Sequence, residues 1–136
     1  MEYPILVSVG IIEQDGKYLV TQRPKNSNHN SLKWEFPGGK VKFGEDPKKS
    51  LERELRDELA VQVKAGDLFG YSSHVYSHNG VEKHFILLAY ICRQVSGEPQ
   101  KNRPEISDLR WVRREDLGSY DFSQAAVPLV EKLIGS

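Results

Sequence analysis

The sequence predicts an α+β fold, a single domain over residues 1–136 in which a mixed sheet lies between an acidic helix and a C-terminal helix. Three observations lead to this expectation. Runs rich in apolar and β-branched residues adjoin the pairs Asp15-Gly16 and Asn79-Gly80, which are typical of hairpin turns. Two other segments carry apolar residues at helical spacing. A chain of 136 residues is long enough for one hydrophobic core and too short to expect two.

The first part of the chain is expected to form a hairpin, a loop and a short strand. Residues 3–12 are rich in Ile and Val, and the apolar pattern resumes at residues 18–20 after the Asp15-Gly16 turn. Residues 24–31 are polar with no apolar period, which predicts a surface loop. Residues 34–36 then predict a short strand before a Pro-Gly-Gly loop.

An acidic helix follows this strand. Asp46 and Pro47 are typical of a helix start, with Asp at the N-cap and Pro in the first helical position. The predicted buried stripe consists of leucines at a spacing of four, namely Leu51, Leu55 and Leu59.

The second half predicts another hairpin, a last strand and a helix. Residues 61–76 alternate in part, and residues 84–92 form the most continuously apolar run, which suits a central buried strand. Residues 109–112 predict a short strand. Residues 123–134 predict a C-terminal helix with Pro128 in its first turns.

Composition excludes several classes of function. The 19 basic and 19 acidic residues balance, so no overall field favours a nucleic acid polymer or an anionic membrane. An apolar run near the length of a membrane span is absent, as is a secretory leader. Cys92 is the only cysteine and excludes an internal disulfide. We therefore expect a cytoplasmic protein, monomeric or homodimeric, whose partner is a small molecule.

Three acids mark the predicted helix as a candidate metal site. Glu54, Asp57 and Glu58 follow one another at i, i+3 and i+4, so their side chains project from one side of the helix. Three close carboxylates repel unless a cation lies between them. Hard oxygen ligands of this kind favour Mg²⁺ or Mn²⁺, with substrate phosphate completing the shell.

The stretch from Gly39 to Val61 resembles the signature of the Nudix hydrolases, G-x5-E-x7-R-E-U-x-E-E-x-G-U, in which U is a bulky aliphatic residue. Seven of its nine positions match, namely Gly39, Glu45, Arg53, Glu54, Leu55, Glu58 and Val61. Asp57 replaces a Glu of the signature, and Ala60 replaces a Gly just after the helix. A left-handed Ala60 would be strained by roughly 1 kcal/mol.

The resemblance implies the α/β/α sandwich of the Nudix family, a divalent cation and hydrolysis of a phosphoanhydride bond. By analogy, the carbonyl of Gly38 and the side chains of Glu54, Asp57 and Glu58 would ligate metal. Arg53 would hold Glu54 in place through a charge-assisted hydrogen bond.

The general base is the least determined of these roles. Family members differ in its position, so Glu54 is the first choice and Glu58 and Glu105 remain open. Glu105 lies six residues before Trp111, similar to the extra metal-linked Glu of MutT-type members.

A narrower resemblance concerns the substrate. The stretch LKWEFPGGKVKFGE, with the preceding Thr-Gln-Arg, is similar to MutT-type enzymes, which convert nucleoside triphosphates to monophosphate and pyrophosphate. It implies that Arg23, Phe36 and Lys40 contact the nucleotide. Members that prefer oxidised guanine read the base with an Asn or Asp, where this chain has Ala126, unless Gln124 substitutes.

The resemblance leaves other substrates open. Pyrimidine triphosphates suit an alanine at position 126. ADP-ribose, nucleotide sugars and dinucleoside polyphosphates are alternatives for the same acids, although members acting on ADP-ribose carry a Pro where this chain has Tyr76. A non-catalytic nucleotide sensor is the remaining alternative, and the retained signature acids argue against it.

Overall fold

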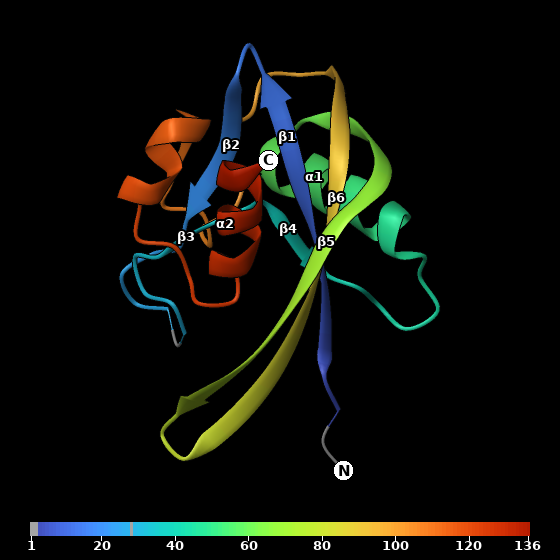
Figure 1. Cartoon of the computed structure of the whole chain (residues 1–136). Coiled ribbons are helices and arrows are strands. Elements are labelled where there is room, and N and C mark those ends of the chain that lie inside the picture. Colours follow the sequence, from blue (N-terminus) through green and yellow to red (C-terminus); the bar gives the residue numbers. More distant parts are fainter. Residues whose placement is uncertain (1–2, 28) are drawn as a thin grey trace.

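The computed structural model describes residues 3–27 and 29–136, in which seven strands form one mixed sheet between two α-helices. Helix α1 (Pro47–Leu59) covers one face of the sheet, and helix α2 (Val127–Gly135) lies on the other (Figure 1). The predicted α+β class, with a mixed sheet between the acidic helix and the C-terminal helix, is confirmed. Within the described ranges, no helix has the length and apolar character needed to cross a membrane.

Strand β1 lies at the centre of the sheet. The strands are β1 (Ile5–Gln14), β2 (Lys17–Gln22), β3 (Trp34–Glu35), β4 (Gly38–Lys40), β5 (Gln62–His78), β6 (Val81–Ser96) and β7 (Asp108–Arg113). Their order is β3-β2-β1-β6-β5, while β4 pairs with β1 and β7 with β2. The β1–β6 pair is parallel and the other pairs are antiparallel. Strand β4 therefore adjoins the central strand, close to helix α1.

Two apolar clusters form the core, one on each face. Leu51, Leu55 and Leu59 are completely buried and pack with Ile12 on the α1 side, which confirms the predicted leucine stripe. Cys92 belongs to the same cluster, and burial raises the pKa of its thiol to about 12, as expected for an unreactive core residue. The cluster on the α2 side joins that helix to the other face of the sheet through Val9, Phe36, Leu87, Leu129 and Val130.

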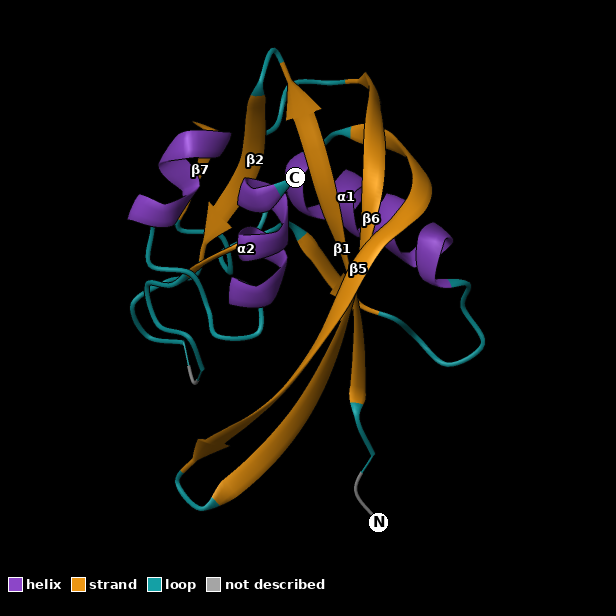
Figure 2. Ribbon diagram, viewed as in Figure 1, coloured by secondary structure: helices purple, strands orange, loops and turns teal. Residues whose placement is uncertain are grey.

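Strands β5, β6 and β7 extend beyond the ends predicted for them, whereas β3 is one residue shorter than predicted. The turn at Asn79-Gly80 is confirmed, and the predicted strand 84–92 is the middle of β6. Figure 2 shows that the β5–β6 hairpin continues as an arm beyond the rest of the sheet. The glycines after residues 34–36, predicted as a loop, form strand β4 because they pair with Val7–Val9 of β1. The predicted loop 24–31 contains residue 28, which lies outside the described residues.

The ends of the helices differ in detail from the prediction. Asp46 has the extended backbone of an N-cap, but its side chain makes no capping bond; its carbonyl accepts from the Ser50 amide instead. Ala60 adopts the left-handed conformation expected of the glycine it replaces, with φ 58°. The C-terminal helix begins at Val127 rather than residue 123, with Pro128 in its first turn as predicted. The sequence also missed the 3₁₀ helix η1 (Arg114–Ser119).

Candidate active site

Strand β4 and helix α1 meet through two glycines. Gly38 and Gly39 lie opposite Val9 and Ser8 of β1. A β-carbon on Gly38 would overlap the carbonyl oxygen of Ser8, and one on Gly39 would overlap the carboxyl group of Glu54. Only a residue without a side chain lets the strand pass so close to the helix. The two glycines therefore bring backbone directly against the Glu54 carboxylate.

Arg53 links the loop before α1 to the helix. Its Nε and Nη2 donate to the two carboxylate oxygens of Glu45 at 2.8 and 3.1 Å, and its Nη1 donates to Glu54 Oε1 at 2.9 Å. The bidentate bond lowers the pKa of Glu45 to about 2. Arg53 lies outside the cleft lining described below, so its guanidinium is positioned to orient Glu54 rather than to contact a ligand there.

Glu54 and Glu58 form a close carboxyl pair. Glu54 is 8% exposed. Burial raises the pKa of Glu58 to about 9, and a hydrogen bond and charge from Glu54 add to the effect, while Arg103 opposes it. Because two neighbouring ionised carboxylates repel, the Glu58 carboxyl group keeps its proton near neutral pH. A divalent cation could supply the missing positive charge.

Only three of the four predicted metal ligands line one cleft. Gly38, Glu54 and Glu58 line the same cleft. Asp57 does not line it; its carboxylate lies 3.8 Å from Arg53 Nη1 and 3.5 Å from Arg103 Nη2. In the described part of the chain, no three acid, His or Cys side chains are grouped closely enough to hold a metal ion. The oxygen donors fit Mg²⁺ or Mn²⁺ as an incomplete set, which water and phosphate would complete.

A cleft of about 510 Å³ extends from these acids, within the range of ligand pockets. It contains each residue expected to contact substrate, together with the alternative base, namely Arg23, Phe36, Lys40 and Glu105. Phe36 is 3% exposed and also packs in the core with Phe122, with ring centroids 5.7 Å apart. The cleft is thus lined both by acids of α1 and by an aromatic residue that follows β3; the individual roles stay predictions.

The cleft lining also includes Glu35 and Tyr76, whose place there sequence reasoning missed. The predicted residue Arg23 lies beside Glu35: Arg23 Nη1 is 3.5 Å from Glu35 Oε1, and Arg23 Nε donates to the His29 carbonyl at 3.1 Å. Burial raises the pKa of Glu35, and the Arg23 charge opposes the rise. Tyr76 belongs to the β5–β6 arm, and its hydroxyl oxygen accepts a hydrogen bond from the Ala125 amide at 2.9 Å.

The residues before α2 do not lie where base recognition by position 126 or by Gln124 would require them. Ala126 is completely buried and does not line the cleft, whereas Ser123 and Ala125 do. Gln124 is exposed and also lies outside the lining, so it is not placed to substitute for an Asn or Asp. The side chains of this segment that reach the cleft are therefore small.

Arg103 is another residue that sequence reasoning missed. It belongs to the connection between β6 and β7, lines the cleft, and lies 3.4 Å from Glu54 Oε2. No local pattern marks it, because strands β5 and β6 separate it in the chain from its partners on α1.

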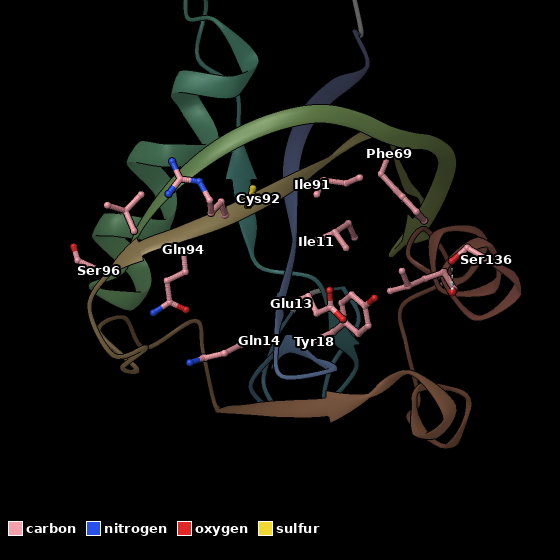
Figure 3. A pocket seen from close by; sticks show the side chains of 13 residues that line it. Ile11, Glu13, Gln14, Tyr18, Phe69, Ile91, Cys92, Gln94, Ser96 and Ser136 are labelled. Atoms are coloured by element: carbon pink, nitrogen blue, oxygen red, sulfur yellow. Dashed lines mark hydrogen bonds between the residues drawn. The ribbon is translucent and has the colours of Figure 1, made fainter.

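A second cavity of about 620 Å³ lies at the other end of β1 and β6 (Figure 3). Its lining includes Ile11, Ile91 and Phe69, with polar side chains such as Glu13 and Gln94 around them. None of the residues predicted for the site lies there, so the cleft at α1 is the candidate active site.

Comparison with known proteins agrees with this geometry. The family model of the NUDIX domain matches residues 3–133. The chain is 37% identical over 127 residues to the CTP pyrophosphohydrolase of Escherichia coli, covering 93% of this chain and 89% of that protein. It is 28% identical to the 8-oxo-dGTP diphosphatase of the same organism, over 93% and 94% of the two chains. The crystal structure of a MutT NUDIX hydrolase from Burkholderia pseudomallei superposes with a TM-score of 0.84 at 27% identity, over 96% and 98%.

Proposed function

Because the chain belongs to the Nudix family, we propose that it hydrolyses nucleoside triphosphates to the monophosphate and pyrophosphate, using Mg²⁺ or Mn²⁺. One observation carries the proposal: the Glu54–Glu58 pair lines a nucleotide-sized cleft that Arg23 and Phe36 also line. Acids that can hold a cation suit the phosphates, and an aromatic residue suits the base.

The residues of the acidic end have separate tasks in this reaction. Gly38, Glu54 and Glu58 would hold the cation, which when bound would neutralise phosphate charge and favour ionisation of water. Glu54 accepts the proton of the attacking water, while Glu58 and Glu105 remain alternatives for this step. Water adds to the α- or the β-phosphorus, the anhydride bond between these two phosphates breaks, and the products are the nucleoside monophosphate and pyrophosphate. Arg53 keeps the Glu54 carboxylate in position throughout.

We propose cytosine nucleotides as the preferred substrates. The similarity to a CTP pyrophosphohydrolase supports this choice, as do the small side chains of Ser123 and Ala125 in the cleft lining. Glu35 supplies a carboxylate that can accept a hydrogen bond from the amino group of cytosine, which uracil lacks. Lys40 and Arg23 also line the cleft and would contact phosphate.

Glu35→Ala tests the base assignment. We expect kcat/KM for CTP to fall about tenfold or more, because the cytosine amino group loses its acceptor, while UTP turnover changes little. Steady-state kinetics with both nucleotides give the ratio. Glu82→Ala, which removes an exposed carboxylate at the end of the β5–β6 arm, is the matched control. An unchanged CTP-to-UTP ratio in Glu35→Ala would exclude Glu35 from base recognition.

A substrate panel tests the proposed reaction class. The purified protein is incubated with Mg²⁺ and standard, oxidised and methylated nucleoside triphosphates, ADP-ribose and diadenosine polyphosphates, and the products are separated by chromatography. Monophosphate and pyrophosphate from one group of triphosphates support the proposal. Cleavage of ADP-ribose or dinucleoside polyphosphates alone would contradict the base assignment, and turnover of none would favour a nucleotide sensor.

Cation binding should release a proton from the carboxyl pair. Because burial raises the pKa of Glu58 to about 9, its carboxyl group is protonated at pH 7.5, and a cation bound by Glu58 displaces that proton. Calorimetric titration with Mg²⁺ in buffers of different ionisation enthalpy should report release of close to one proton, and Glu58→Gln should abolish it. Zero release by the unaltered protein would place the cation elsewhere.

We propose a cytoplasmic monomer or homodimer, supported by the single, buried Cys92 and by the balanced charge. Neither property enters the assignment of the site.

A further inference from the structure

Arg103 holds an unusual place for a positively charged residue. Its Nη1 lies 3.4 Å from Glu54 Oε2 and its Nη2 lies 3.5 Å from Asp57 Oδ2. The guanidinium thus bridges two of the acids expected to ligate metal. No sequence motif includes Arg103, and it has no role in the proposed reaction.

The contacts of Arg103 are looser than those of Arg53. Charge-assisted bonds are usually formed at about 2.7–2.9 Å. Arg53 reaches Glu45 at 2.8 Å and Glu54 at 2.9 Å and is 21% exposed, whereas the Arg103 contacts measure 3.4 and 3.5 Å and its side chain is 37% exposed. Arg53 is therefore a fixed support of Glu54. Arg103 is a counter-ion that can be exchanged at little cost.

The backbone next to Arg103 is well anchored although its side chain is loosely paired. The amides of Gln100 and Asn102 donate to the carbonyls of Leu59 and Glu58 at 2.8 and 3.0 Å. These bonds satisfy carbonyls at the end of α1 that the helix itself leaves unpaired. The guanidinium can therefore change partners while its backbone stays beside the acids.

The charges of the site suggest which partner replaces the acids. A divalent cation held by Glu54 and Glu58 would repel the guanidinium from Glu54. Arg103 lines the same cleft as Lys40 and Glu58, where the proposed triphosphate supplies anionic oxygens. A planar guanidinium binds such oxygens in two parallel bonds.

We propose that Arg103 alternates between two partners, pairing with Glu54 and Asp57 in the metal-free protein and binding the polyphosphate of the substrate once the cation is present. This inference rests on the proposed function for the identity of the anion. Arg103 is then a substrate-binding residue. Its release from Glu54 and Asp57 when the cation binds frees the guanidinium for the polyphosphate, which couples the two binding events.

Arg103→Gln tests the exchange without measuring turnover. Mn²⁺ binding is measured by electron paramagnetic resonance in the absence of nucleotide, and pyrophosphate binding by calorimetry in the presence of saturating Mn²⁺. Loss of the competing guanidinium should tighten Mn²⁺ binding about fivefold, and loss of the anion contact should weaken pyrophosphate binding about tenfold. The two shifts have opposite signs, which a general loss of structure would not produce.

Lys101→Gln is the matched control. Lys101 lies on the same connection, is exposed, and its Nζ contacts the Ser107 carbonyl rather than a carboxylate. Lys101→Gln removes one positive charge from the same connection as Arg103→Gln does. An effect of net charge alone would therefore change the ligand affinities of both variants equally. If Arg103→Gln had the same Mn²⁺ affinity or the same pyrophosphate affinity as Lys101→Gln, the inference would be overturned.

The two proposals fail separately. A protein that binds Mn²⁺ and pyrophosphate as described but hydrolyses no triphosphate would retain the Arg103 exchange and lose the proposed function. A protein that hydrolyses triphosphates while its Arg103→Gln variant binds both ligands as the control does would retain the function and lose the exchange.

Discussion

Glu54→Gln should lower kcat at least on the order of a hundredfold while the protein stays folded. The substitution removes a carboxylate that would hold the cation and accept the proton of water, yet it keeps the shape of the side chain. The amide oxygen of the introduced glutamine can still accept from Arg53 Nη1, which lies 2.9 Å from Glu54 Oε1 in the unaltered protein. Turnover at saturating Mg²⁺ and the melting temperature give the two required measurements.

Glu52→Gln is the control for this experiment. Glu52 lies on the same helix but outside the cleft lining, where its Oε2 accepts from the Ala65 amide at 3.0 Å. A glutamine oxygen can keep that bond, so turnover should stay near that of the unaltered protein. Equal turnover in Glu54→Gln and Glu52→Gln would contradict the assignment of Glu54.

Gly39→Ala should be nearly as damaging, although it adds one methyl group. The new β-carbon would overlap the Glu54 carboxyl group, so that side chain must move out of its place. A displacement of about 1 Å at a reacting group can cost on the order of a hundredfold in rate. We expect a loss of that size in kcat, measured with the preferred triphosphate, and weaker Mn²⁺ binding.

Gly44→Ala separates this effect from backbone strain. Gly44 has φ +81°, so alanine is strained there by roughly 1 kcal/mol. Nothing lies within 4 Å of the added β-carbon, so the carboxylates are unaffected. This variant should lose stability but retain turnover. Gly39→Ala that retained turnover as well would show that Glu54 has room to adjust.

Features set by neighbours in the chain were predictable. Pro47 and the leucine spacing indicated helix α1, and the Asp15-Gly16 and Asn79-Gly80 pairs indicated the hairpin turns, because each depends on a few adjacent residues. The spacing of Glu54 and Glu58 likewise follows from the helix period. The resemblance to a known signature then indicated what these acids do.

Features set by distant contacts were not predictable. The segment before Val127 has helical spacing, but the Ser123 amide bonds to the Trp34 carbonyl and the Ala125 amide to the Tyr76 hydroxyl. These long-range bonds hold it in a turn, so α2 begins later than local pattern indicates. Arg103 reaches the acids only because the β6–β7 connection is tied to the end of α1, and no residue beside it in the sequence reveals that contact.

The most direct test of the central claim is phosphorus NMR of CTP incubated with the protein and Mg²⁺. The account predicts resonances of CMP and pyrophosphate growing together, and their absence when EDTA removes the cation. Formation of CDP and inorganic phosphate, or hydrolysis that continues in EDTA, would contradict a cation-dependent pyrophosphohydrolase built around Glu54 and Glu58.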